Sequence, residues 1–216
     1  MIILLLGKPG SGKGTQAKLL VDKFGLYYFA TGDFSRNLAK NDPRVAEIVS
    51  SGKLIPEDEM TDHVIKFLEE KQSFLKNILF EGFPRYVTQY QKLEEWLGGK
   101  GFKFDFVFLI DVSDEEVVRR LSARRIDKNT GKIYNLITEP PGADVDPKNL
   151  EQRSDDSEET IKKRLEVFNE NTLPTIEYAQ KVGKLVKIDG GRSIDEIQKD
   201  LVTAIEDKLK NEASSN

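Results

Sequence analysis

The sequence contains no cysteine and only one histidine among its 216 residues. Without thiols the chain can form neither disulfides nor thiolate-bound zinc sites, a composition that suits a reducing compartment, and we expect a cytoplasmic protein. The single histidine, His63, lies in a charged stretch with helical spacing. We expect it to pack on a surface helix, so a mechanism that needs a histidine general base has no candidate.

Long apolar runs are also missing. The apolar stretch 2–6 lacks a basic flank and leads directly into a glycine-rich turn, so we expect neither a signal peptide nor a membrane span. Hydrophobic residues make up 38% of the chain and charged residues 32%, with a formal net charge of −4. This balance predicts a globular protein, and the acidic excess argues against binding to nucleic acid.

Short apolar runs of the kind found in buried parallel strands recur along the chain. They lie at residues 2–6, 27–29, 77–81, 105–111 and 184–189. Segments with helical spacing separate them, from a helix at 15–24 to a last helix at 193–209 with a frayed tail from Asn211. The alternation predicts an α/β fold with a five-stranded parallel sheet covered by helices on both faces.

Helical spacing stops between about 126 and 152, where glycine, proline, asparagine and aspartate dominate. A segment of this length favours a functional lid with small strands, one of them at 132–134. Before it, Arg120 and Arg124 are spaced to share one face of a helix. After it, we expect helix from 155 to 180.

Residues 7–13 read Gly-Lys-Pro-Gly-Ser-Gly-Lys and match the phosphate-loop pattern G-x-x-x-x-G-K. The glycines let the backbone turn so that N–H groups face an anion, and Lys13 neutralises phosphate charge. The expected strand before the loop and helix after it supply the context that the motif needs. Gly14 follows the lysine, and the usual hydroxyl residue comes one position later, as Thr15.

With Gln16, this segment resembles the opening of adenylate kinases and related nucleoside monophosphate kinases, and the resemblance continues in order to about Leu201. It implies a single P-loop kinase domain with a helical monophosphate-binding arm and a small lid of the long type. The implied core comprises 1–30, 60–120 and 157–216, the arm 31–59 and the lid 121–156. The implied ATP-binding residues are Gly10, Ser11, Gly12, Lys13, Gly14, Thr15, Arg120, Arg124 and Arg192.

The acceptor side is indicated by Gly82-Phe83-Pro84-Arg85, which follows an expected strand. The carboxyl edge of an open α/β sheet is where ligands bind, and a planar guanidinium there suits a phosphate. By resemblance Arg85 grips the acceptor phosphate, while Thr31 and Gln89 contact the base and favour AMP. The implied AMP-binding residues are Thr31, Arg36, Lys53, Ile55, Gly82, Arg85, Gln89, Arg153 and Arg164.

The chain departs from the family pattern in a few places. Glu81 stands where relatives usually have aspartate, and with Asp33 it is expected to reach magnesium through water. Tyr86 replaces a small residue beside Arg85, and Phe34-Ser35 replaces an apolar pair. Many relatives hold the lid with zinc ligands; here those positions are Ile126 and Asn129, so no zinc is expected.

The resemblance implies that Lys13, Arg85, Arg124, Arg153 and Arg164 surround the transferring phosphoryl group. Arg120 then packs on the ATP adenine, with the backbone of Arg192 nearby, whereas we interpret Arg119 and Arg125 as solvated helix residues. The implied activity is reversible transfer of the terminal phosphoryl group of Mg-ATP to AMP, giving two ADP, as the lid and arm close over the nucleotides. A monomer is expected. A UMP/CMP kinase, or a regulatory module that binds nucleotide without catalysis, are the alternatives.

Overall fold

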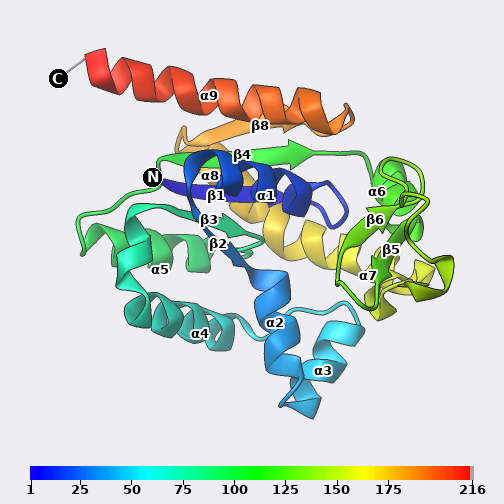
Figure 1. Ribbon diagram of the computed structural model, residues 1–216. Coiled ribbons are helices and arrows are strands. Elements are labelled where there is room, and N and C mark those ends of the chain that lie inside the picture. Colours follow the sequence, from blue (N-terminus) through cyan, green and yellow to red (C-terminus); the bar gives the residue numbers. More distant parts are fainter. Residues whose placement is uncertain (215–216) are drawn as a thin grey trace.

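A parallel sheet forms the centre of the molecule, as the sequence predicts. The computed structural model describes residues 1–214. The sheet has five strands in the order β2-β3-β1-β4-β8, and every pairing is parallel. The strands are β1 (Ile2–Gly7), β2 (Tyr27–Ala30), β3 (Ile78–Glu81), β4 (Phe106–Asp111) and β8 (Leu185–Asp189). Their carboxyl ends point toward the same side of the molecule (Figure 1).

Helices cover both faces of the sheet because successive side chains of each buried strand point to opposite faces. On β1, Ile2 and Leu4 enter one core cluster and Ile3 and Leu5 the other. The first cluster is closed by α4 (Glu57–Glu70), α5 (Val87–Gly98) and α8 (Leu173–Lys181). The second is closed by α1 (Lys13–Phe24), α6 (Asp114–Ser122), α7 (Glu158–Val167) and α9 (Ile194–Ser214).

Two smaller units extend from the carboxyl side of the sheet (Figure 1). One consists of α2 (Thr31–Ala39) and α3 (Pro43–Ser50), which we call the arm. The other is an antiparallel sheet in the order β6-β5-β7, which we call the lid. Its strands are β5 (Arg124–Asp127), β6 (Ile133–Asn135) and β7 (Leu150–Glu151). Short turns of 3-10 helix complete the chain at Gln72–Lys76, Pro147–Asn149 and Ser154–Asp156.

The expectation that Arg120 and Arg124 share a helix face is wrong. Helix α6 ends at Ser122, and Arg124 is the first residue of β5, paired with Asn135. The lid itself ends the helix: the Asn135 amide donates to the Arg120 carbonyl at 2.9 Å, and Leu136 N–H donates to the Ala123 carbonyl at 3.0 Å. These donors from a distant segment replace the N–H groups that would continue the helix.

Other boundaries also differ from the sequence-based expectation. The helix expected over 155–180 is broken by a π-helical turn, Phe168–Thr172. Pro174 follows in the first turn of α8, where its missing N–H breaks the regular ladder. Helix α1 begins at Lys13 rather than at 15, and α9 continues as helix to Ser214 where we expected fraying. Among the described residues, no helix is both long and apolar enough to cross a membrane.

Tyr90 on α5 provides a test of the core. It is fully buried between the rings of Phe104 and Tyr178, and its hydroxyl has no hydrogen-bond partner among the described residues. A buried unpaired hydroxyl costs roughly 1–3 kcal/mol. We therefore predict that Tyr90→Phe raises the free energy of unfolding by about 1 kcal/mol in chemical denaturation. Leu93→Ala on the same helix should lower it by about 2–5 kcal/mol, and a destabilised Tyr90→Phe would contradict the assignment.

Candidate active site

The loop between β1 and α1 wraps around its own lysine. Gly10 and Gly12 have φ angles of 74° and 94°, a left-handed region that favours glycine. A Cβ on Gly10 would also lie 2.7 Å from the Leu121 side chain. The loop therefore needs glycine at this position both for its backbone conformation and for its packing against α6. Gly14 and Thr15 follow in the first turn of α1, whose free N–H groups and dipole favour an anion.

Lys13 is buried inside this loop, with 8% of its surface exposed. Its ammonium donates to the carbonyls of Gly7 and Lys8 at 2.8 and 2.7 Å, and lies 3.4 Å from the Ser11 hydroxyl. Burial lowers the pKa of Lys13 to about 8, and Arg85 contributes to the lowering. The direct hydrogen-bond acceptors of the ammonium are neutral groups, and the nearby Glu81 carboxylate favours its charge from a greater distance. An incoming phosphate would add negative charge in direct contact.

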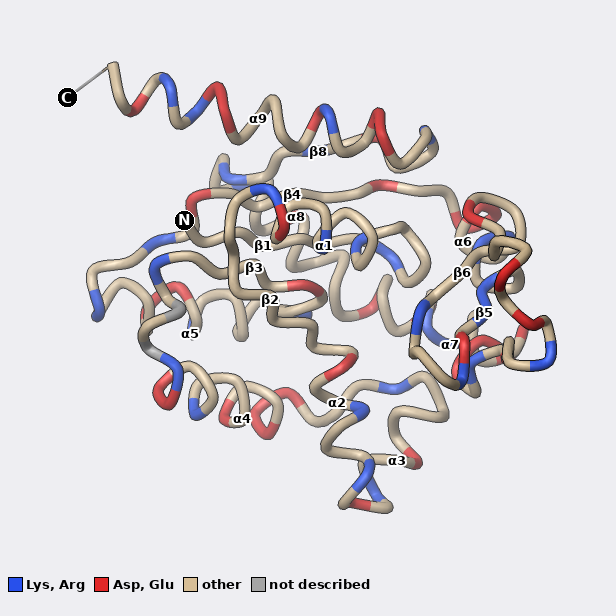
Figure 2. The backbone as a smooth tube through the Cα atoms, viewed as in Figure 1, with Lys and Arg blue, Asp and Glu red and all other residues tan. Residues whose placement is uncertain are grey.

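Several arginines from different parts of the fold converge beside Lys13. Burial lowers the pKa values of Arg85 and Arg164 and lowers that of Arg153 to about 10. Neighbouring guanidinium groups lower them further: chiefly Arg164 in the case of Arg85, and Arg124 in the cases of Arg153 and Arg164. Figure 2 shows basic positions along β5, with acidic positions on adjacent segments. Cations that disfavour one another's charge in this way form a site suited to a polyanion.

A buried aspartate fixes two of these arginines. Arg124 binds Asp156 through two parallel hydrogen bonds of 2.6 and 2.7 Å, and Arg164 reaches the same carboxylate at 3.1 Å. Asp155 forms a second ion pair with Arg164, at 3.1 Å. The side chain of Asp156 is completely buried. Neither aspartate is among the site residues predicted from the sequence, although adjacent acids among arginines are the signal that could have identified them.

On the acceptor side, Arg85 lies in the turn between β3 and α5. Its side-chain Nε donates to the Gly82 carbonyl at 2.8 Å, and its backbone N–H donates to Gln89 Oε1 at 2.9 Å. The Gln89 nitrogen donates to the Glu57 carbonyl at 3.1 Å, so the amide joins the Arg85 turn to the start of α4. Thr31 donates its hydroxyl to the Glu81 carbonyl at 3.0 Å.

A cavity opens between the arm, the phosphate loop and α7. Most residues expected to bind AMP line it: Thr31, Arg36, Lys53, Ile55, Arg85, Gln89 and Arg164. Gly82 and Arg153 are not among its lining residues. Its apolar walls include Met60, Phe83 and Phe168, and Tyr86 also lines it. The cavity thus combines cationic groups for a phosphate with flat apolar surfaces for a ring.

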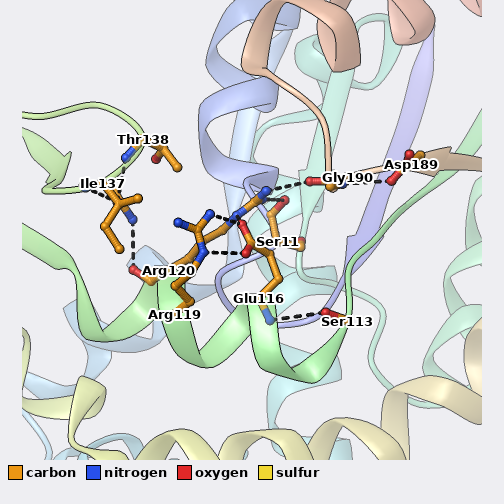
Figure 3. Close-up of polar contacts among 11 residues, drawn as sticks. Ser11, Ser113, Glu116, Arg119, Arg120, Ile137, Thr138, Asp189 and Gly190 are labelled. Carbon is orange, nitrogen blue, oxygen red and sulfur yellow. Dashed lines mark hydrogen bonds and ion pairs between the residues drawn. The ribbon is translucent and has the colours of Figure 1, made fainter.

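The residues expected near the ATP base lie on the other side of the loop. Arg120 binds Glu116 at 2.6 Å, the Gly190 carbonyl at 2.8 Å and the Ser11 carbonyl at 3.4 Å (Figure 3). It therefore links α6, the phosphate loop and the turn after β8. Arg192 in that turn pairs with Asp200. Glu116 accepts hydrogen bonds from both Arg119 and Arg120, and these bonds lower its pKa to about 2.

Two carboxylates lie close to the loop. Glu81 Oε2 accepts a hydrogen bond of 3.2 Å from the Tyr28 hydroxyl, and Asp33 pairs with Arg36 at 2.5 Å. No group of three or more potential metal-ligating side chains occurs in the described part of the chain. Magnesium is commonly held by one or two carboxylates together with substrate phosphates, so Glu81 and Asp33 fit such a metal. Tyr28 is a site residue that sequence reasoning missed.

The chain was compared with known proteins. The family model described as adenylate kinase matches residues 5–184. A protein named adenylate kinase from Thermosipho africanus is 40% identical over 213 residues, which cover 95% of this chain and 99% of the relative. Similar matches come from Thermoanaerobacter sp. (39% over 218 residues; 97% and 100% covered) and Natronomonas pharaonis (39% over 210 residues; 96% and 98% covered). Both carry the same name.

The buried carboxylate of Asp156 provides a test of how the arginines are held. Asp156→Asn removes the charge that Arg124 and Arg164 share and turns an N–H₂ group toward one of the arginine donors. We predict that the free energy of unfolding falls by about 3 kcal/mol, because a buried ion pair has lost one partner. Chemical denaturation checks this.

Glu158→Gln is the matched control. Glu158 pairs with Lys162 on the exposed surface of α7, next to the same segment. Because both side chains are solvated, stability should scarcely change. If Asp156→Asn is as stable as the control, Asp156 does not anchor the arginines.

Proposed function

This chain belongs to the adenylate kinase family and transfers the terminal phosphoryl group of ATP reversibly to AMP, giving two ADP, and we propose that the converging cations described above carry the transfer. The observation that supports this most strongly is the convergence of Arg36, Arg85 and Arg164 on one cavity beside the loop that buries Lys13. The lowered pKa values of Lys13, Arg85, Arg153 and Arg164 agree with it. Burial and mutual repulsion disfavour the charged forms of these groups. Bound phosphates would therefore stabilise them more than they would stabilise cations exposed to water.

ATP occupies the loop side in this proposal. The free N–H groups at the start of α1, with Gly10, Ser11, Gly12, Gly14 and Thr15 around them, hold its phosphates. Lys13 exchanges contact with the Gly7 and Lys8 carbonyls for contact with the outer phosphates. Arg120 and the backbone near Arg192 flank the adenine, since the bond from Arg120 to Gly190 holds these two elements together.

AMP occupies the cavity between the arm and α7. Arg36 and Arg85 orient its phosphate, and Thr31, Lys53, Ile55 and Gly82 enclose the nucleoside. Gln89 uses one acceptor site and one N–H in its bonds to Arg85 and Glu57, which leaves one of each free. That pair matches the adenine edge, which also offers one donor beside one acceptor. The similar proteins are named adenylate kinase, which favours AMP over a pyrimidine acceptor and an enzyme over a module without catalysis.

Between the two nucleotides, Arg124, Arg153 and Arg164 distribute the negative charge that develops on the transferring group. The AMP phosphate is already an anion, so the reaction needs no general base, in keeping with the position of His63 beside Glu59 and Phe34, away from the loop. Arg153 forms no ion pair within 4 Å in the described part of the chain, so its charge is available for the phosphoryl group. Closure of the lid and arm then excludes water as a competing acceptor.

Members of this family generally use ATP with magnesium. When bound, magnesium supplies positive charge to the outer phosphates. We propose that Glu81, assisted by Asp33, holds it through water, and that the lid requires no zinc. We propose that the working unit is a monomer. The cysteine-free composition suits a cytoplasmic location.

Arg85 tests the proposal most cleanly, because its guanidinium bonds only to the Gly82 carbonyl among described residues. We predict that Arg85→Ala lowers kcat for ADP formation on the order of a thousandfold, while circular dichroism and thermal melting stay unchanged. Arg119→Ala is the matched control, since Arg119 is an exposed arginine that contacts Glu116 and no proposed substrate position. A near-normal rate for Arg85→Ala, or an unfolded variant, would contradict the assignment.

A further inference from the structure

Tyr28 and Glu81 form a hydrogen-bonded pair on neighbouring strands of the sheet. The parallel register places Ala30 beside Glu81, so Tyr28 lies two residues earlier on β2. Its long side chain spans this diagonal, and its hydroxyl donates to Glu81 Oε2 at 3.2 Å. We propose that Tyr28 is a positioning residue that orients the Glu81 carboxylate toward the magnesium of the bound nucleotide. The inference rests on the magnesium role proposed for Glu81 above.

The pair lies directly against the phosphate loop. A Cβ built on Gly14 would stand 3.7 Å from the Tyr28 hydroxyl, so this hydroxyl packs beside the residue that follows Lys13. Glu81 is the negative charge that most favours the ammonium form of Lys13. The hydroxyl, the carboxylate and the ammonium therefore lie around one place, where the outer phosphates and their metal would bind.

The phenol is the donor of this pair. An ionised carboxylate can only accept, and a tyrosine hydroxyl ordinarily keeps its proton up to about pH 10, so the proton lies on the hydroxyl and points to Glu81. Glu81 Oε1 forms no hydrogen bond or ion pair within the described chain, so one oxygen is held and the other is free to face the metal.

The length of Glu81 explains why it benefits from such a partner. Glutamate has one more rotatable bond than aspartate, so fixing its carboxylate costs more conformational entropy. The Tyr28 hydrogen bond selects one orientation before the nucleotide arrives, which reduces the ordering cost of binding. An aspartate at position 81 would end one methylene earlier and could not accept the hydroxyl at this distance. Tyr28 and Glu81 therefore function as a matched pair.

A double-mutant cycle tests the pair. Tyr28→Phe, Glu81→Asp and the double variant are compared with the unaltered protein for ATP affinity by calorimetry, with excess magnesium and with EDTA. In the Glu81 background, Tyr28→Phe should weaken ATP binding about fivefold with magnesium and less than twofold with EDTA, because one hydrogen bond to the carboxylate is lost. In the Glu81→Asp background the same change should have little effect in either condition.

Tyr90→Phe is the matched control, since it removes a tyrosine hydroxyl from the core far from the loop and should leave ATP binding unchanged. The proposal is overturned if Tyr28→Phe weakens binding equally with magnesium and with EDTA, or equally in both Glu81 backgrounds. Either result would mean that the ring only shapes the loop. Thermal melting of each variant verifies that it is folded.

Glu81→Ala separates this inference from its premise. If Glu81→Ala abolishes the magnesium-dependent gain in ATP affinity but Tyr28→Phe leaves it intact, the role of Tyr28 fails and that of Glu81 stands. If Glu81→Ala leaves the gain unchanged, the proposed magnesium role of Glu81 fails first.

Discussion

Repulsion between buried cations is the constraint on which the rest of the structure depends. Lys13 and the arginines around it come from the sheet edge, the arm, the lid and α7, and burial lowers the pKa of several of them. Without an anion such an arrangement is unfavourable, so it must be held by other contacts. Buried Asp156 fixes Arg124 and Arg164, and loop carbonyls fix Lys13. In the proposed function, phosphates replace repulsion with attraction, and this change couples nucleotide binding to closure of the arm and lid over the sheet.

The residues assigned to the site come partly from the ends of sheet strands and partly from segments outside the sheet. The phosphate loop and the Arg85 turn both follow strands of the sheet, β1 and β3, which pair with each other along their length. In the proposed function, these neighbouring strand ends set the distance between the donor and acceptor phosphates. The remaining arginines come from segments outside the sheet. Tyr28 and Glu81 lie on adjacent strands of the sheet, which suits the role proposed for them in holding a metal in one place.

Local patterns in the sequence predicted the sheet and the phosphate loop, because buried strands and glycine-rich turns can be recognised from a short stretch of neighbouring residues. The contacts that complete the site could not be predicted in this way. Arg124 and Asp156 lie 32 positions apart, and Tyr28 and Glu81 lie 53 positions apart. Helical spacing placed Arg124 on the wrong element because Asn135 and Leu136 of the lid end α6. The end of α6, and with it the position of Arg124, therefore depends on tertiary hydrogen bonds that the local sequence does not reveal.

Proton uptake on ATP binding measures the central claim most directly. With a pKa of about 8, Lys13 is largely neutral in the free protein at pH 9 and largely charged at pH 7. Bound phosphates raise that pKa, so binding at pH 9 should take up about 0.8 proton more than binding at pH 7. Calorimetry in buffers of different ionisation enthalpy gives this number. An uptake that is the same at both pH values would contradict the account, because Lys13 would then carry its full charge before any phosphate arrives.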